Sequence, residues 1–291
     1  MLVKCDMLEI MKRSLLSRLR TNGIYYLAGA LLLLIGVPAF QALILTPEGY
    51  NKALSGSDVS ALASYLSWIG GHTVLFLIYR LLLAGAFALL LTLPFSLFRI
   101  IVAQEIMAQQ EQTDKEDVDE KEAVQENSAM QETEQTSGIP VDAWRGKGFV
   151  VVAAWAGLVG LMIYILGTIA STLYLESASS GFTPGAAVSG AIVMLTSIFS
   201  IITNTVGIGL IALSTLFFGA MIARAGLRLW PGVWVAFGYA AIAVTALSSG
   251  SAVALATAPL SQSPLTTPAI FFFALWTLWF GIMLVRLKPE S

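Results

Sequence analysis

The chain has little charge and almost none of the side chains used for redox chemistry or metal binding. Of its 291 residues only 12% are charged, whereas a soluble domain has about 25%, and 57% are hydrophobic. Cys5 is the only cysteine and His72 the only histidine. These scarcities exclude an internal disulfide, a cysteine metal cluster and most histidine-based catalysis. The composition is typical of an integral membrane protein.

Carboxylates are missing from every long apolar run. Eleven of the 18 acidic residues fall between Glu105 and Glu134, and Glu48, Asp58 and Glu176 lie between the predicted spans. Ion-coupled transporters usually bind and release their ion at an ionisable group inside the bilayer, so this pattern argues against ion coupling. We expect no enzymatic activity, no cofactor, no metal site and no nucleic-acid partner.

Six apolar runs are long enough to cross a bilayer as helices. About 20 apolar residues span a hydrocarbon core of about 30 Å. The runs cover approximately 24–45, 77–101, 149–173, 195–222, 232–256 and 268–286. The sequence therefore predicts an all-α fold, a polytopic transmembrane helix bundle with six spanning helices. Because 185–223 is long enough for two short helices broken near Asn204, seven spans are the alternative.

The distribution of basic residues favours six spans with both termini in the cytoplasm. Cytoplasmic segments of membrane proteins carry an excess of Lys and Arg. With six spans, 14 of the 16 Lys and Arg residues are cytoplasmic, and only Lys52 and Arg80 lie outside. Seven spans would divide them ten to six. We expect residues 185–194 to extend the fourth helix on the outer side.

The spans divide the chain into five parts. These are a basic cytoplasmic N-terminus (1–23), a first transmembrane hairpin (24–103), an acidic cytoplasmic linker (104–148), a four-helix transmembrane region (149–286) and a cytoplasmic tail (287–291). In the outer loop 46–72, Val59, Leu62, Leu66 and Ile69 recur at helical spacing and predict a short helix lying in the membrane interface. The composition of the acidic linker predicts disorder. Either it is a solvated tether or it docks a basic protein partner.

Small or weakly polar residues recur every three or four positions along three predicted helices, so each set shares one helix face. The third helix contributes Ala153, Gly157, Gly160 and Gly167, and the others contribute the polar seam Ser197, Ser200, Asn204, Gly207, Thr245 and Ser248. Such faces let helices approach closely, so we expect a compact three-helix unit. Asn204 either bonds across to Thr245 or Ser248 or lines a hydrated cavity.

Arg80 falls within the second apolar run, near its predicted outer end. With His72 and Tyr79 it could form an anion contact at the outer membrane interface. Alternatively, its side chain snorkels to the interface and marks the edge of the membrane. Pro94, at the other end of the same helix, predicts a kink.

Two predicted helices end alike. Leu216–Arg224 and Leu278–Arg286 align Phe, Gly, Met and Arg without gaps, which suggests duplicated hairpins. Together with Pro231-Gly232-Val233-Trp234 and Gly238-Tyr239, these segments resemble a pattern seen in uncharacterised bacterial multi-pass membrane proteins of domain-of-unknown-function families. The resemblance implies a multi-pass protein of the bacterial plasma membrane and implies no activity.

Two functions are consistent with the sequence. The first is a non-enzymatic structural or regulatory protein that acts through partners, in addition to its contact with membrane lipids. The acidic linker and the lack of intramembrane charge favour it. The alternative is an uncoupled carrier or channel for a neutral or lipophilic small solute, which would use the polar seam. A hydrated seam would favour the carrier, and a dry seam would favour the first function.

Overall fold

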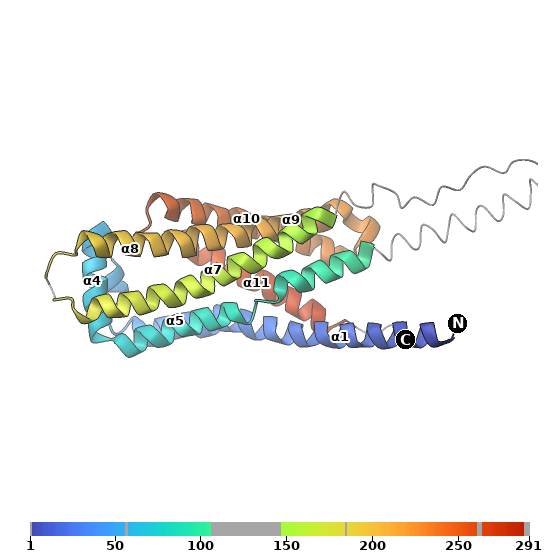
Figure 1. Cartoon of the computed structure of the whole chain (residues 1–291), viewed down its shortest axis with the longest axis horizontal. Helices are drawn as coiled ribbons and strands as arrows, with labels where there is room; N and C mark the ends of the chain where they lie inside the picture. The colour runs from blue at the N-terminus through green and yellow to red at the C-terminus, as the bar shows by residue number, and fades with distance from the viewer. Residues whose placement is uncertain (1, 56–57, 106–146, 184, 261–263, 288–291) are drawn as a thin grey trace, which may run out of the picture.

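The computed structural model is all-helical over the residues that it describes, which are 2–55, 58–105, 147–183, 185–260 and 264–287 (Figure 1). Among these residues, six helical stretches are long and apolar enough to cross a membrane: Ser17–Leu45, Thr73–Glu105, Gly148–Ser180, Gly190–Leu229, Gly232–Thr257 and Thr266–Val285. The chain is therefore a multi-pass membrane protein with six candidate spans, as predicted. The acidic linker falls almost entirely outside the described residues.

The first span combines α-helical and π-helical turns. It consists of α1 (Leu2–Leu31), the π-helix η1 (Leu32–Gly36), α2 (Val37–Phe40) and a second π-helix, η2 (Gln41–Leu45). Pro38 has no N–H to donate to the preceding turn, and the widened turn of η1 lies immediately before it. Two short helices follow, α3 (Tyr50–Leu54) and α4 (Asp58–Gly71).

The second span is interrupted just before Pro94, as predicted. Helix α5 (Thr73–Ala88) ends in turns over residues 89–92, and the helix resumes at residue 93. Pro94 has no amide hydrogen for the carbonyl of Leu90, which accepts instead from the N–H of Leu93 at 2.9 Å. The local change of hydrogen bonding gives the kink a physical cause.

The fourth span is continuous, in agreement with six spans rather than seven. Helix α8 (Gly190–Ser200), the π-helix η4 (Ile201–Gly207) and α9 (Ile208–Leu229) follow one another without a break. Around Asn204 the turn widens instead of ending. The expected extension over 185–194 is wrong at its start, because helix α8 begins only at Gly190, where the Ser189 hydroxyl accepts a hydrogen bond from the Ile192 N–H.

Paired glycines allow the backbones of neighbouring helices to approach closely. Helix α9 packs on both α7 (Lys147–Ser180) and α10 (Gly232–Thr257), so the predicted three-helix unit is centred on α9, and α11 (Thr266–Val285) packs on α1. A Cβ at Gly219 would lie 2.8 Å from the carbonyl oxygen of Gly238, and one at Gly281 would lie 3.0 Å from that of Gly23. Gly219 and Gly281 are equivalent in the two similar helix ends, so both ends make the same kind of backbone contact.

Helix α4 lies across one end of the bundle (Figure 1), which we call the α4 end. Leu62, Leu66 and Ile69 are buried there in a cluster with Tyr50 and Leu175, on α3 and α7. The predicted short helix therefore exists, and at these three residues its apolar face packs on protein. Arg20 ties the opposite end together by donating from Nε to the Leu287 carbonyl at 2.9 Å.

Candidate functional site

A polar cavity of about 180 Å³ lies near the α4 end, between α4, α5, α7 and the α8–η4 stretch. Ten of its 17 lining residues are polar: Tyr65, Arg80, Tyr164, Thr168, Ser171, Tyr174, Thr196, Ser200, Thr203 and Asn204. The others are Leu54, Ala61, Leu62, Leu175, Phe199, Pro259 and Leu260. Arg80 is the one lining residue with a formal charge, and no lining residue is Asp or Glu. The cavity thus combines polar groups and one positive charge with apolar wall.

Arg80 is directed into the bundle. From α5 its Nε donates to the Thr172 hydroxyl at 3.1 Å, and its Nη2 donates to the Ser171 hydroxyl at 2.7 Å. The guanidinium carbon also lies 6.0 Å from the centre of the Phe76 ring, at the limit of a cation–π contact. These contacts on α7 do not fit the interpretation that Arg80 snorkels away from the protein to the membrane interface.

The two hydroxyls that accept hydrogen bonds from Arg80 donate their own protons to a backbone carbonyl. Ser171 donates to the Thr168 carbonyl at 3.0 Å, and Thr172 donates to the same carbonyl at 2.6 Å. Each hydroxyl has one proton and two lone pairs, so both side chains can present only acceptor lone pairs to the guanidinium. This arrangement orients Arg80 without neutralising its charge.

Two residues of the polar seam, Ser200 and Asn204, line the cavity. The Asn204 amide donates to the Ser200 hydroxyl at 3.3 Å within the same helical stretch. The expected bond from Asn204 to Thr245 or Ser248 is not made. Instead, Thr245 Oγ1 lies 3.2 Å from the Ala212 carbonyl oxygen and 2.9 Å from that of Ala241.

The other seam residues lie elsewhere. The Ser197 hydroxyl donates to the Val193 carbonyl at 2.8 Å, and Ser248 is buried on α10. Gly207 packs against α7, where an added Cβ would lie 3.3 Å from the Gly160 carbonyl oxygen. The predicted seam therefore separates into a cavity wall and a set of packing contacts between helices.

Thr196 and Thr203 are cavity residues that the seam did not include. Their hydroxyl oxygens are buried and have no hydrogen-bond partner among the described residues, and the Thr203 hydroxyl packs against Gly167. Thr196, Ser200 and Thr203 are spaced i, i+4 and i+7, so helical periodicity could have found them. The tyrosines could not be found in this way, because they come from helices that the sequence alone does not place side by side.

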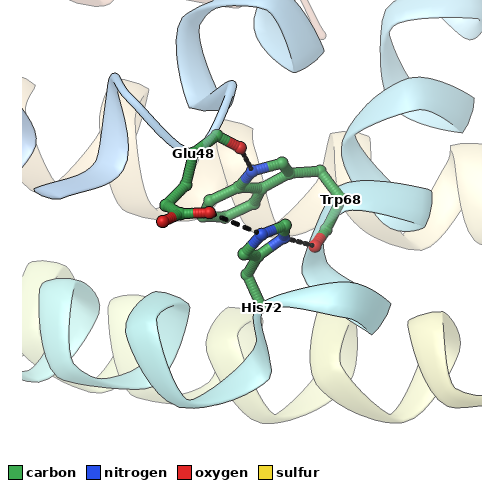
Figure 2. A network of polar contacts seen from close by, with 3 residues as sticks. All are labelled: Glu48, Trp68 and His72. Atoms are coloured by element: carbon green, nitrogen blue, oxygen red, sulfur yellow. Dashed lines mark hydrogen bonds and ion pairs between the residues drawn. The ribbon is translucent and has the colours of Figure 1, made fainter.

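His72 does not join Arg80 in one site. Figure 2 shows that His72 lies between Glu48 and Trp68, with its Nε2 3.3 Å from Glu48 Oε2 and its Nδ1 3.0 Å from the Trp68 carbonyl oxygen. Its ring stacks on that of Trp68, with centroids 4.9 Å apart. The Trp68 indole N–H donates to the Glu48 carbonyl at 2.7 Å. These contacts fasten the loop before α3 to the end of α4, outside the cavity lining.

Within the described ranges, no group of three His, Cys, Asp or Glu side chains comes together as a metal site would require. Comparison with protein-family models, curated proteins and solved structures gives no match to this chain.

Proposed function

We propose that the protein is a non-enzymatic membrane protein that binds a small solute in the polar cavity, as an uncoupled carrier or channel. The observation that supports this function is the position of Ser200 and Asn204 on the cavity wall. Polar groups at membrane depth need internal partners or water. Because these two side chains face a cavity and not a helix seam, water or a solute can meet their remaining hydrogen-bonding groups.

The lining chemistry supports uncoupled binding. A coupling proton or sodium ion needs a carboxylate or a comparable ionisable group that can bind and release it. The cavity lining contains neutral hydroxyl, phenol and amide groups together with Arg80, and no carboxylate. The solute would thus move down its own gradient.

Cysteine accessibility tests the proposal. In a Cys5→Ser background, Ser200→Cys and Asn204→Cys should react with a small, water-soluble methanethiosulfonate reagent in membranes. Ile198→Cys and Ile202→Cys are matched controls, because these side chains are 38% and 43% exposed on the outside of the bundle and should face lipid. Equally unreactive cysteines at all four positions would contradict a hydrated cavity.

A structural or regulatory role through a protein partner is the second proposal. It rests on the acidic composition of 104–148, where most of the acidic residues are concentrated. A basic partner would be attracted by this charge. Deletion of residues 109–139 would then abolish the partner's binding and leave reactivity at Ser200→Cys unchanged.

We also propose that both termini lie in the cytoplasm of a bacterial plasma membrane, with the α4 end outside. This orientation keeps 14 of the 16 Lys and Arg residues on the cytoplasmic side. The cavity would then lie closer to the outer surface.

A further inference from the structure

The charge of Arg80 has no counter-charge in the described part of the chain. Arginine stays protonated in proteins, and no described carboxylate lies within ion-pair distance of its guanidinium. Glu48, at the same end of the bundle, is paired with His72 instead. A charge that is partly buried without a counter-ion is costly, and the cost falls when an opposite charge binds.

Arg80 also has N–H donors that can bind an anion. Its guanidinium carries five N–H groups, and the bonds to Thr172 and Ser171 use two of them. No described residue accepts from the other three N–H groups, which can therefore bind a ligand or water. A planar fork of this kind matches the two oxygens of a carboxylate or a phosphate.

The acceptor hydroxyls of Ser171 and Thr172 fix the guanidinium on its α7 side, so the free donors lie on its remaining edges. Asn204 adds a neutral amide to the cavity wall. Neutral donors beside one fixed cation suit an anion, whereas a cationic solute would meet repulsion from Arg80 and find no carboxylate in the lining.

The cavity volume limits the solute to a small molecule, and the one cationic side chain in the lining suits a single negative charge. The cavity volume of about 180 Å³ is slightly larger than an apolar cavity of about 150 Å³ that holds one benzene. Leu62, Leu175 and Phe199 supply apolar surface for the body of the solute. One cation and this volume do not suit polyanions or nucleotides.

We infer that the cavity binds a singly charged oxyanion, a carboxylate or phosphodiester group on a compact apolar body, with the oxyanion held by Arg80. This inference rests on the proposed function, because it names the class of solute in the same cavity. It replaces the sequence-based expectation of a neutral or lipophilic solute with an anionic one.

The test uses benzoate as the probe and benzamide as its neutral, nearly isosteric control. Binding to the purified full chain is measured by calorimetry in phosphatidylcholine nanodiscs. Hydrogen bonds to a charged group predict that benzoate binds about 10- to 100-fold more tightly than benzamide. Arg80→Gln should remove this preference and leave benzamide binding unchanged, while the control Lys52→Gln, a cation at the same end but outside the cavity lining, should alter neither.

Equal binding of benzoate and benzamide by the wild type, or a benzoate preference that survives Arg80→Gln, would overturn the inference. If Arg80→Gln does not accumulate in the membrane, Arg80→Lys replaces it. Lysine keeps the charge but lacks the planar guanidinium, so the preference for benzoate over benzamide should fall without vanishing. An unchanged preference would count against Arg80 as the oxyanion ligand.

Two further comparisons separate the possible causes of failure and the sources of the anion. If neither probe binds but Ser200→Cys and Asn204→Cys react, the anion inference fails and the hydrated cavity stands; if these cysteines are also unreactive, both fail. Repeating the titration in phosphatidylglycerol nanodiscs distinguishes a lipid headgroup from a free acid. Loss of benzoate binding there supports an anionic lipid as the bound oxyanion, and unchanged binding supports a free small acid.

Discussion

Gly160 and Gly207 face each other across the contact between α7 and η4, so closely that a Cβ at Gly160 would lie 2.8 Å from the Gly207 carbonyl oxygen. Backbone atoms cannot move aside as a flexible side chain can. The two glycines therefore set the distance between two helical segments that both line the cavity.

Gly160→Ala should destabilise the bundle by about 1–3 kcal/mol, the usual cost of overpacking. Gly209→Ala is the matched control, because nothing lies within 4 Å of an added Cβ there. The control should be neutral or stabilising by up to about 1 kcal/mol, since alanine favours the helix. Reversible unfolding in detergent micelles measures both, and equal stabilities would show that the glycine contact is not tight.

Arg80→Met should leave the free energy of unfolding unchanged or raise it by up to about 2 kcal/mol. Ser171 and Thr172 keep their bonds to the Thr168 carbonyl, and an unneutralised charge is replaced by a shorter, unbranched apolar side chain. Unfolding in micelles without added anion measures the change. A loss of about 3–5 kcal/mol, typical of breaking a buried pair, would mean that Arg80 serves the fold instead of a ligand.

The stability of the protein should fall at alkaline pH, partly because of Tyr50. Burial, followed by the neighbouring Tyr65 and Tyr79, raises the pKa of Tyr50 well above its usual value of 10.0. The unfolded chain then loses this proton first, so the stabilisation is complete below pH 10 and is lost as the pH rises towards the pKa of the folded state. Unfolding measured from pH 8 to 11 should show a shallower decline for Tyr50→Phe, and identical slopes would contradict the assignment.

Reporter fusions test the orientation. Fusions after residues 50, 125, 178, 227, 262 and 291 should report outside, inside, outside, inside, outside and inside. The reason is the charge bias, with only Lys52 and Arg80 among 16 basic residues on the outer side. An outside signal after residues 227 and 291 would reverse the last part of this topology.

The helices could be predicted because hydrophobicity and length determine them directly. The runs around Leu81 and Ile208 needed no knowledge of their neighbours, and Pro94 determined its own kink through a missing N–H. The α4 helix was predicted from the spacing of Leu62 and Leu66, but its surroundings were not. An apolar face looks the same whether it will meet lipid or protein.

The candidate site was predicted only where its residues share one helix. Ser200 and Asn204 could be grouped by spacing, whereas the direction of Arg80 depends on Ser171 and Thr172, which are more than 90 positions away in the chain. The expected partners of Asn204 failed for a related reason. The Thr245 hydroxyl donates to backbone carbonyls on α9 and α10 instead. Composition and periodicity do not predict which acceptor a threonine hydroxyl uses.

The π-helix Ile201–Gly207 makes the fourth span tolerant of one change in length and intolerant of the opposite one. A π-helical turn holds about one residue more than an α-helical turn, because its hydrogen bonds join i and i+5 instead of i and i+4. If one residue were deleted within this stretch, a regular α-helix could form while Ser200 and the helix beyond Gly207 kept nearly their present orientations. An inserted residue would instead rotate everything beyond it by about 100°, so insertion here should disturb the cavity wall more than deletion does.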